Sequence, residues 1–292
     1  MLADLIQRMG SDVSIGMMEA VGAIALCFAV VLISRRFAVH VERESVISLV
    51  RGLVQMVVVG MVLAALLHGN ALVGVLILLA MMFAAAVTAS RRAEGIRDAL
   101  LCFYAIAPGA GTVIAAMLAT RTLKPDIAIL VPVGSMIIAN AMNACAQSIE
   151  RFTADVTAHV GQVEAGLALG AEPAVTVAPY VQSAVYASLL PRLDMLKSLG
   201  LVWIPGVMAG MMVSGASPIY AGIYQFIIVA MLLAASGITG LLATLLIRTR
   251  AFSPAAQLTL RPGEPHKPEL VQIVSDTFER IHGAVNFKRG RL

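Results

Sequence analysis

Residue patterns that would carry enzymatic chemistry are missing from this sequence of 292 residues. None of its four lysines follows a glycine, so the phosphate-binding motif GxxxxGK[ST] does not occur. The sequence also contains no HExxH, no GxSxG and no pair of carboxylates inside an apolar run. We therefore expect a chain that is not an enzyme and that does not itself bind ATP through such a loop.

Cysteines offer no site either. Cys27, Cys102 and Cys145 fall in three different apolar runs, without a CxxC pair or a Cys/His cluster. This spacing predicts packing in a core rather than a disulfide framework or a zinc site. Metal ligands stay unknown at this stage.

A few polar residues inside apolar runs are the remaining candidates for chemistry. Asn140 and Asn143 lie three residues apart, on one face of a helix, and an amide in an apolar run must find a partner. They either line a substrate path or hydrogen-bond to a neighbouring helix. Gln55, a turn beyond Arg51, is a candidate for the same path. Arg51 and Glu19 also lie close to an expected membrane edge, where a charged side chain can reach water.

Composition identifies the elements that must position these residues. The chain is 59% hydrophobic and only 13% charged, with a mean hydropathy of +0.89. Soluble domains are about 25% charged, so we expect an integral membrane protein. Runs of about 20 apolar residues predict transmembrane helices. The seven predicted spans are Gly16–Ile33, Val46–Leu67, Ala71–Ala89, Ala99–Ala119, Ile127–Ala146, Leu199–Val213 and Tyr220–Ile247.

Basic residues predict the orientation, because lysine and arginine stay on the cytoplasmic side. With the N-terminus outside and the C-terminus inside, 18 of the 21 basic residues lie inside. The long connection 148–198 is then cytoplasmic. The pI of about 9.2 follows from this topology and from attraction to the inner leaflet, and needs no nucleic-acid partner.

Two parts of different polarity follow along the chain. Residues 1–249 form the expected membrane domain, which includes the cytoplasmic connection. Residues 250–292 carry 11 charges and form the expected cytoplasmic tail. Within the tail, residues 268–283 place apolar side chains at helical spacing between a proline and a glycine, so we expect an amphipathic helix there.

A compact hairpin is predicted inside the connection. An Ala/Leu-rich helix pattern over 163–169 stops at Gly170, since glycine accepts a left-handed backbone. A second helix begins after Pro173, runs from about Val175 to Leu190 and ends at Pro191. Such a turn is suited to docking in a groove of another protein.

These residues resemble a known family. Glu164-Ala165, with Gly170-Ala171 and Pro173 after them, resemble the EAA loop of ABC-transporter permeases, whose coupling helix sits in a cleft of the ATPase subunit. The stretch from Leu189 to Gly210 is similar to the signature of the FetB-like iron-export permease family, whose plant relatives are aluminium-tolerance half-transporters. Its hinge and signature residues in this sequence are Pro191, Asp194, Lys197, Pro205, Gly206, Gly210 and, further on, Gln225.

The resemblance implies an all-helical permease in the cell inner membrane that works as a homodimer with a cytoplasmic ABC ATPase. ATP and Mg²⁺ would then bind on that partner and no cofactor on this chain. Iron or another metal species would be exported. The family's usual arginines are replaced by Gln182 and Tyr186, and the tail is longer than in the family. Because the predicted spans contain no cluster of Asp, Glu, His or Cys, a chelated or polar organic substrate stays open. An ATP-independent channel or secondary carrier for a polar or chelated solute is the alternative, and a non-transporting scaffold is a third.

Two proline-glycine pairs and a methionine cluster complete the candidates. Pro108-Gly109 in the fourth span and Pro205-Gly206 in the sixth predict bends that could serve as hinges. Asp194 and Lys197 are spaced to pair with each other. The methionines of the sixth span could offer soft ligands, but soft donors select copper rather than iron, so packing is expected for them.

Overall fold

The computed structural model of the chain describes residues 18–29, 42–66, 71–92, 98–253 and 255–260. The chain divides into two compact units, residues 1–68 and 69–292, and each is described by itself. The first unit contains helix Met18–Ala29 and α2 (Glu42–Leu66). Apolar residues of these two helices, with Cys27 and Gly52 among them, line a pocket of about 750 Å³.

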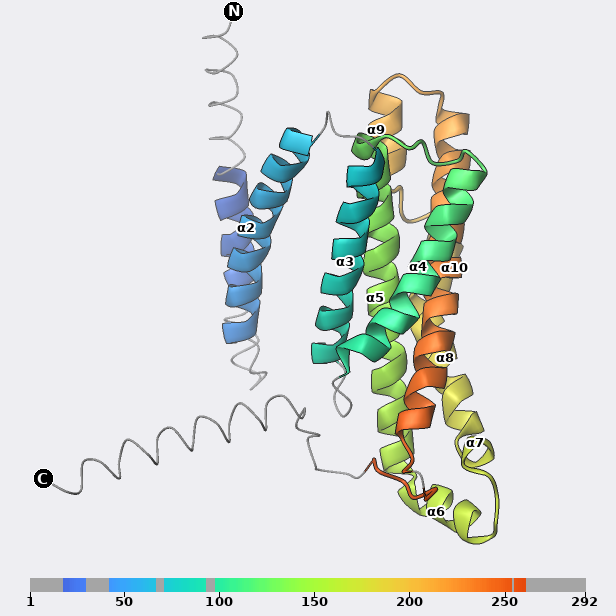
Figure 1. The fold of residues 1–292 in the computed structure, drawn as a ribbon. Coiled ribbons are helices and arrows are strands. Elements are labelled where there is room, and N and C mark those ends of the chain that lie inside the picture. Colours follow the sequence, from blue (N-terminus) through green and yellow to red (C-terminus); the bar gives the residue numbers. More distant parts are fainter. Residues whose placement is uncertain (1–17, 30–41, 67–70, 93–97, 254, 261–292) are drawn as a thin grey trace, which may run out of the picture. The chain divides into compact units, whose positions relative to one another are not determined.

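Helices also make up nearly all of the described part of the second unit (Figure 1). They are α3 (Ala71–Arg92), α4 (Ala99–Ala119), α5 (Ile127–Ala158), α6 (Val160–Ala168), α7 (Pro173–Thr176), α8 (Ala178–Ser198), α9 (Gly206–Val213) and α10 (Pro218–Arg250). α5 and α10 form the centre of the bundle: α5 packs against α3, α4, α8 and α10, and α10 packs against α4, α5, α8 and α9.

Short polar residues start the long helices. The Asp98 carboxylate accepts hydrogen bonds from two backbone N–H groups at the start of α4, and Asp126 accepts one at the start of α5. Ser217 caps α10, followed by Pro218 at the first helical position. Each cap satisfies an N–H that has no partner within the helix. An ion pair between Asp98 and Arg250, with Nη2 3.4 Å from Oδ2, joins the start of α4 to the end of α10.

Four helices of the described chain, α3, α4, α5 and α10, are long and apolar enough to cross a membrane. They contain the third, fourth, fifth and seventh predicted spans, which are confirmed as helices. α5 and α10 have 32 and 33 residues. At 1.5 Å per residue each is about 48 Å long, whereas the hydrocarbon layer is about 30 Å thick. Each helix is therefore longer than the hydrocarbon layer is thick, and both run to the end of the bundle that carries α6 and α7 (Figure 1).

The sixth predicted span, Leu199–Val213, is wrong as a single helix. Residues 199–205 are not helical, and α9 has only eight residues. Gly200 has φ +77 and its N–H donates to the carbonyl of Trp203, which closes a turn after α8. α8 itself continues to Ser198 through Pro191, where the sequence predicted its end. A proline inside a helix costs about 3 kcal/mol, and the packing of α8 on α5 and α10 offsets that cost.

The expected hinge in the fourth span lies at a tight helix crossing. α4 is continuous through Pro108 and Gly109, and Gly109 is buried. A Cβ placed on Gly109 would overlap the Thr239 hydroxyl of α10 and would lie 3.0 Å from the Thr239 backbone nitrogen. Gly109 therefore allows α4 and α10 to approach closely, as small residues do between membrane helices.

Candidate functional site

The hairpin predicted around Gly170 is present as α6, a turn and α7. Gly170 has φ +85, a conformation that glycine adopts at little cost. Its N–H donates to the Leu167 carbonyl (3.0 Å), and the Ala171 N–H donates to the Gly166 carbonyl (3.0 Å). This pair of bonds is the Schellman motif that ends a helix. Pro173 occupies the first position of α7. Residues 160–176 are called the coupling hairpin below.

Contacts at its base hold the coupling hairpin against the bundle. Val163 and Val177 are buried. The Tyr180 hydroxyl donates to Gln162 Oε1 at 3.1 Å, and the Tyr180 ring stacks on His159 with centroids 5.3 Å apart. These contacts connect α6 to the start of α8. The hairpin and α8 therefore form one packed body.

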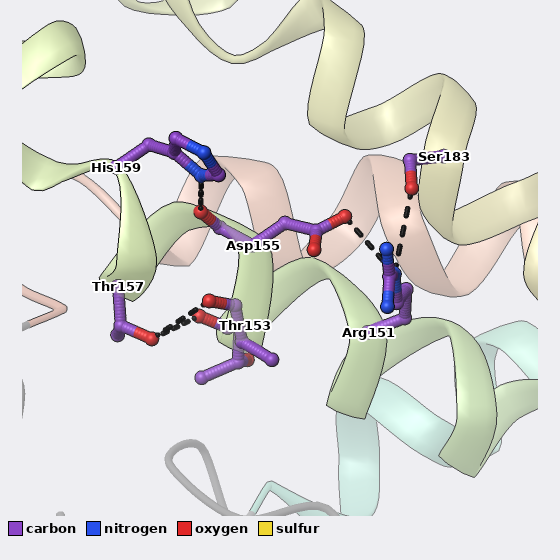
Figure 2. A network of polar contacts seen from close by, with 7 residues as sticks. Arg151, Thr153, Asp155, Thr157, His159 and Ser183 are labelled. Atoms are coloured by element: carbon purple, nitrogen blue, oxygen red, sulfur yellow. Dashed lines mark hydrogen bonds and ion pairs between the residues drawn. The ribbon is translucent and has the colours of Figure 1, made fainter.

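A network of polar contacts joins the end of α5 to α8 beside the hairpin (Figure 2). Arg151 Nε donates to Asp155 Oδ2 at 3.1 Å and to Ser183 Oγ of α8 at 3.4 Å. The His159 Nδ1–H donates to the Asp155 carbonyl at 2.8 Å. Arg151 is more than half exposed, so the ion pair is worth only about 0.3–0.5 kcal/mol. The Arg151–Ser183 hydrogen bond joins the C-terminal part of α5, from which the hairpin departs, to α8.

Two large apolar side chains of the hairpin are exposed. Leu169 is 89% exposed and Val175 is 63% exposed. Of the residues predicted for coupling, Glu164, Ala165 and Gly170 are exposed. Ala171 and Pro173 are half-buried beside them. All five predicted coupling residues thus lie together on one hairpin.

A pocket of about 490 Å³ lies between α7 and the end of α10. Glu172 and Pro173 line it from one side, and Arg248 and Phe252 from the other. Residues 251–253 and 255–260, in the first part of the predicted tail, fold back here, and a bridge joins Phe252 to Leu258. They pack against the bundle. The predicted amphipathic helix 268–283 lies outside the described residues.

Amide side chains form a half-buried stripe on α5. Asn140 Nδ2 donates to the Met136 carbonyl at 2.7 Å, and Asn143 Oδ1 accepts from Arg92 Nη1 of α3 at 3.0 Å. Asn143 therefore makes the hydrogen bond between helices that was one of the two alternatives. Gln147, one turn further, belongs to the same stripe, and its Oε1 is buried with no partner in the described part of the chain. Sequence reasoning missed Gln147, although its spacing of four from Asn143 could have indicated it.

The other predicted path residues lie elsewhere. Arg51 and Gln55 are exposed on one face of α2. They belong to the first unit, so their position relative to the α5 stripe is not described.

Signature residues are distributed along α8, α9 and α10. Lys197 Nζ lies 3.3 Å from Asp194 Oδ1, which confirms the predicted pair. Pro205 precedes α9, which begins at Gly206 and includes Gly210. Gln225 of α10 is buried, and its Oε1 has no partner among the described residues.

The remaining predicted residues are exposed or half-buried. Gln182 and Tyr186 are exposed one turn apart on α8. Met208 and Met211 are half-buried on α9. The described residues contain no group of three or more histidine, cysteine, aspartate or glutamate side chains that could hold a metal ion.

Long apolar helices with a packed hairpin at one end define an all-helical, multi-span membrane protein. The chain belongs to the family described as "Uncharacterised protein family (UPF0014)", which matches residues 17–252. This confirms the resemblance to the FetB-like family. No solved structure matches the chain.

Relatives from plants and bacteria cover most of the chain. The rice (Oryza sativa subsp. japonica) "UPF0014 membrane protein STAR2" is 30% identical over 84% of this chain and 86% of its own. The Escherichia coli (strain K12) "Probable iron export permease protein FetB" is 29% identical over 82% and 93%. The Arabidopsis thaliana "Protein ALUMINUM SENSITIVE 3" is 28% identical over 83% and 90%. Membrane proteins, one of them named as a permease, are therefore the chain's relatives.

Proposed function

We propose that the chain is the membrane subunit of an ATP-driven ABC transporter that exports iron or another metal species from the cytoplasm. One observation carries this proposal: a hairpin with an exposed apolar tip, Leu169, extends from the bundle at the end of α5, a helix longer than the hydrocarbon layer is thick. A carrier that worked without a partner would have no use for such a projection. The relative named as an iron export permease supports the direction and the cargo.

In this mechanism the coupling hairpin sits in a groove of a cytoplasmic ATPase, in a plasma-membrane complex with two copies of each subunit. ATP binding draws the two ATPases together and moves the hairpins with them. Tyr180 fastens the hairpin to α8, and Arg151 joins α8 to α5. Because α8 packs on α10 as well as on α5, motion of the hairpin is passed to both central helices.

The α5 stripe is the proposed lining of the path. Its amides are half-buried, and Gln147 Oε1 has no partner among the described residues, so a polar solute would complete its hydrogen bonding. Asn143 is held by Arg92, which fixes the amide in the middle of the stripe. Arg51 and Gln55, in the first unit, are proposed as path residues on the ground of the sequence alone.

Co-purification tests the proposal. The tagged chain is isolated from membranes in mild detergent, and we expect a stoichiometric ATPase subunit to accompany it, with vanadate-sensitive ATP hydrolysis. Glu164→Lys should remove the ATPase from the preparation while membrane insertion is unchanged, because Glu164 is exposed on the hairpin. Glu150→Lys is the matched control, since Glu150 is an exposed carboxylate on α5 outside the hairpin.

Absence of any ATPase partner would refute the proposal and favour a channel or secondary carrier. Retention of the ATPase by Glu164→Lys would refute the coupling assignment alone. Hydrolysis measured across metal ions and their chelates then identifies the cargo.

A further inference from the structure

Contacts between α8 and α10 fix how these two helices face each other. A Cβ on Gly240 of α10 would lie 2.5 Å from Ser188 Oγ of α8, and one on Gly237 would lie 3.5 Å from Leu189 Cδ2. The helices run in opposite directions (Figure 1). One turn further along α8, Arg192 is therefore opposite the turn of α10 that precedes Gly240.

That opposing turn contains a second polar residue, Ser236. Ser236 is fully buried, and its Oγ has no hydrogen-bond partner in the described chain. The Nε of Arg192 is also buried and without a partner there. Within the described residues, the guanidinium group makes one side-chain hydrogen bond, in which Nη1 donates to Met195 Sδ at 3.8 Å. Two polar groups without partners among the described residues therefore lie on opposing turns of this seam between α8 and α10.

No carboxylate neutralises Arg192 among the described ion pairs. Asp194, two residues away, is exposed and pairs with Lys197. An unpaired charge that is partly withdrawn from water is costly, and most buried polar groups in proteins have a partner. Since a guanidinium group forms two parallel hydrogen bonds with a carboxylate or a phosphate, such an anion would satisfy the Arg192 Nε.

Arg192 and the α5 stripe lie at similar heights along the bundle axis. Ser183 of α8 contacts Arg151 of α5. Arg192 follows Ser183 by nine residues, which is about 13 Å along the helix. The same distance back along α5 from Arg151 reaches the turn that contains Asn143. Arg192 thus lies level with the middle of the amide stripe.

We propose that Arg192, with Ser236 beside it, binds a carboxylate or phosphate group of the transported solute, so that a metal crosses as an anionic chelate rather than as a bare cation. This inference rests on the proposed transport function and specifies its substrate class. The α5 stripe fits it, because neutral amides carry no charge that would repel an anionic chelate and their N–H groups can donate to it. The lack of a metal-binding cluster in the described residues is consistent with it.

Anion binding by the purified full-length chain, without any ATPase, tests this proposal. Trp203 is the single tryptophan of the chain and follows Arg192 by eleven residues, so its fluorescence serves as the signal. The chain is placed in phosphatidylcholine nanodiscs and titrated with citrate or, separately, with ferrous chloride. We expect saturable binding of citrate and none of the bare cation.

Variants then assign the site. Arg192→Gln should weaken citrate binding about tenfold or more, because a hydrogen bond with a charged group is lost. Arg192→Lys should be intermediate, since it keeps the charge without the two-pronged geometry. Arg91→Gln is the control, because Arg91 is an exposed arginine at the end of α3. Equal thermal unfolding midpoints show that the variants are folded.

Three results would overturn the proposal: no saturable citrate binding, wild-type affinity in Arg192→Gln, or loss of citrate binding when phosphatidylglycerol is added to the nanodiscs. The last would assign the site to a lipid phosphate. Failure of the ATPase to co-purify would refute the proposed function but would leave the citrate titration unaffected, so the two failures are distinguishable.

Discussion

Leu169 at the tip of the coupling hairpin gives the sharpest test of how the partner binds. Its side chain is 89% exposed, so it contributes almost nothing to the fold of the isolated chain. In an ATPase groove the same side chain would be buried. Leu169→Ala removes three carbon atoms at about 0.8 kcal/mol each, or about 2.4 kcal/mol, and this corresponds to about a 50-fold loss of affinity.

The measurement is the dissociation constant of the purified ATPase for the chain in nanodiscs, by biolayer interferometry. Leu201→Ala is the matched control. Leu201 is 87% exposed, in the turn between α8 and α9. Its truncation removes the same carbon atoms outside the hairpin and should leave the dissociation constant unchanged.

The reasoning would be refuted if Leu169→Ala bound the ATPase as tightly as the wild type while the thermal unfolding midpoint stayed the same. It would also be refuted if both truncations weakened binding equally. In the first case the hairpin does not enter a groove. In the second case the loss follows from exposed apolar area in general.

Three further outcomes are expected. Gly170→Ala places a side chain at φ +85, which costs about 1 kcal/mol, and should therefore speed amide hydrogen exchange of the hairpin about fivefold. Gly161→Ala is the control, because its added Cβ meets open space, and it should not speed exchange. Gly109→Ala should destabilise the chain by about 1–3 kcal/mol and lower its thermal unfolding midpoint, because its Cβ would overlap α10. Gly111→Ala is the control: its Cβ has no atom within reach, so the midpoint should stay unchanged. The double substitution Asn140→Leu and Asn143→Leu should reduce transport without affecting ATPase co-purification. Unchanged transport would leave only the helix-packing role for the two amides.

Local chemistry made the hairpin predictable. Gly170 and Pro173 act within a few residues of themselves, one through a left-handed backbone and the other through its missing N–H. The third, fourth, fifth and seventh spans were predictable for a similar reason, since the length of an apolar run is a property of the run alone.

Helix ends that depend on packing were not predictable. Pro191 marked a helix end by its own preference, yet α8 continues through it because both neighbouring helices hold it. The break in the predicted span Leu199–Val213 was also missed. Hydropathy alone indicated one span there, whereas Gly200 forms a turn.

Sequence by itself determined that the chain is a helical membrane protein of this family with a hairpin between its fifth and sixth predicted spans. Tertiary structure alone decided which polar groups have partners. Asn143 bonds to Arg92, 51 residues earlier, whereas Arg192 Nε and Ser236 Oγ are without partners in the described chain. Such pairing depends on which helix faces meet, and residue types along one helix do not specify its neighbour.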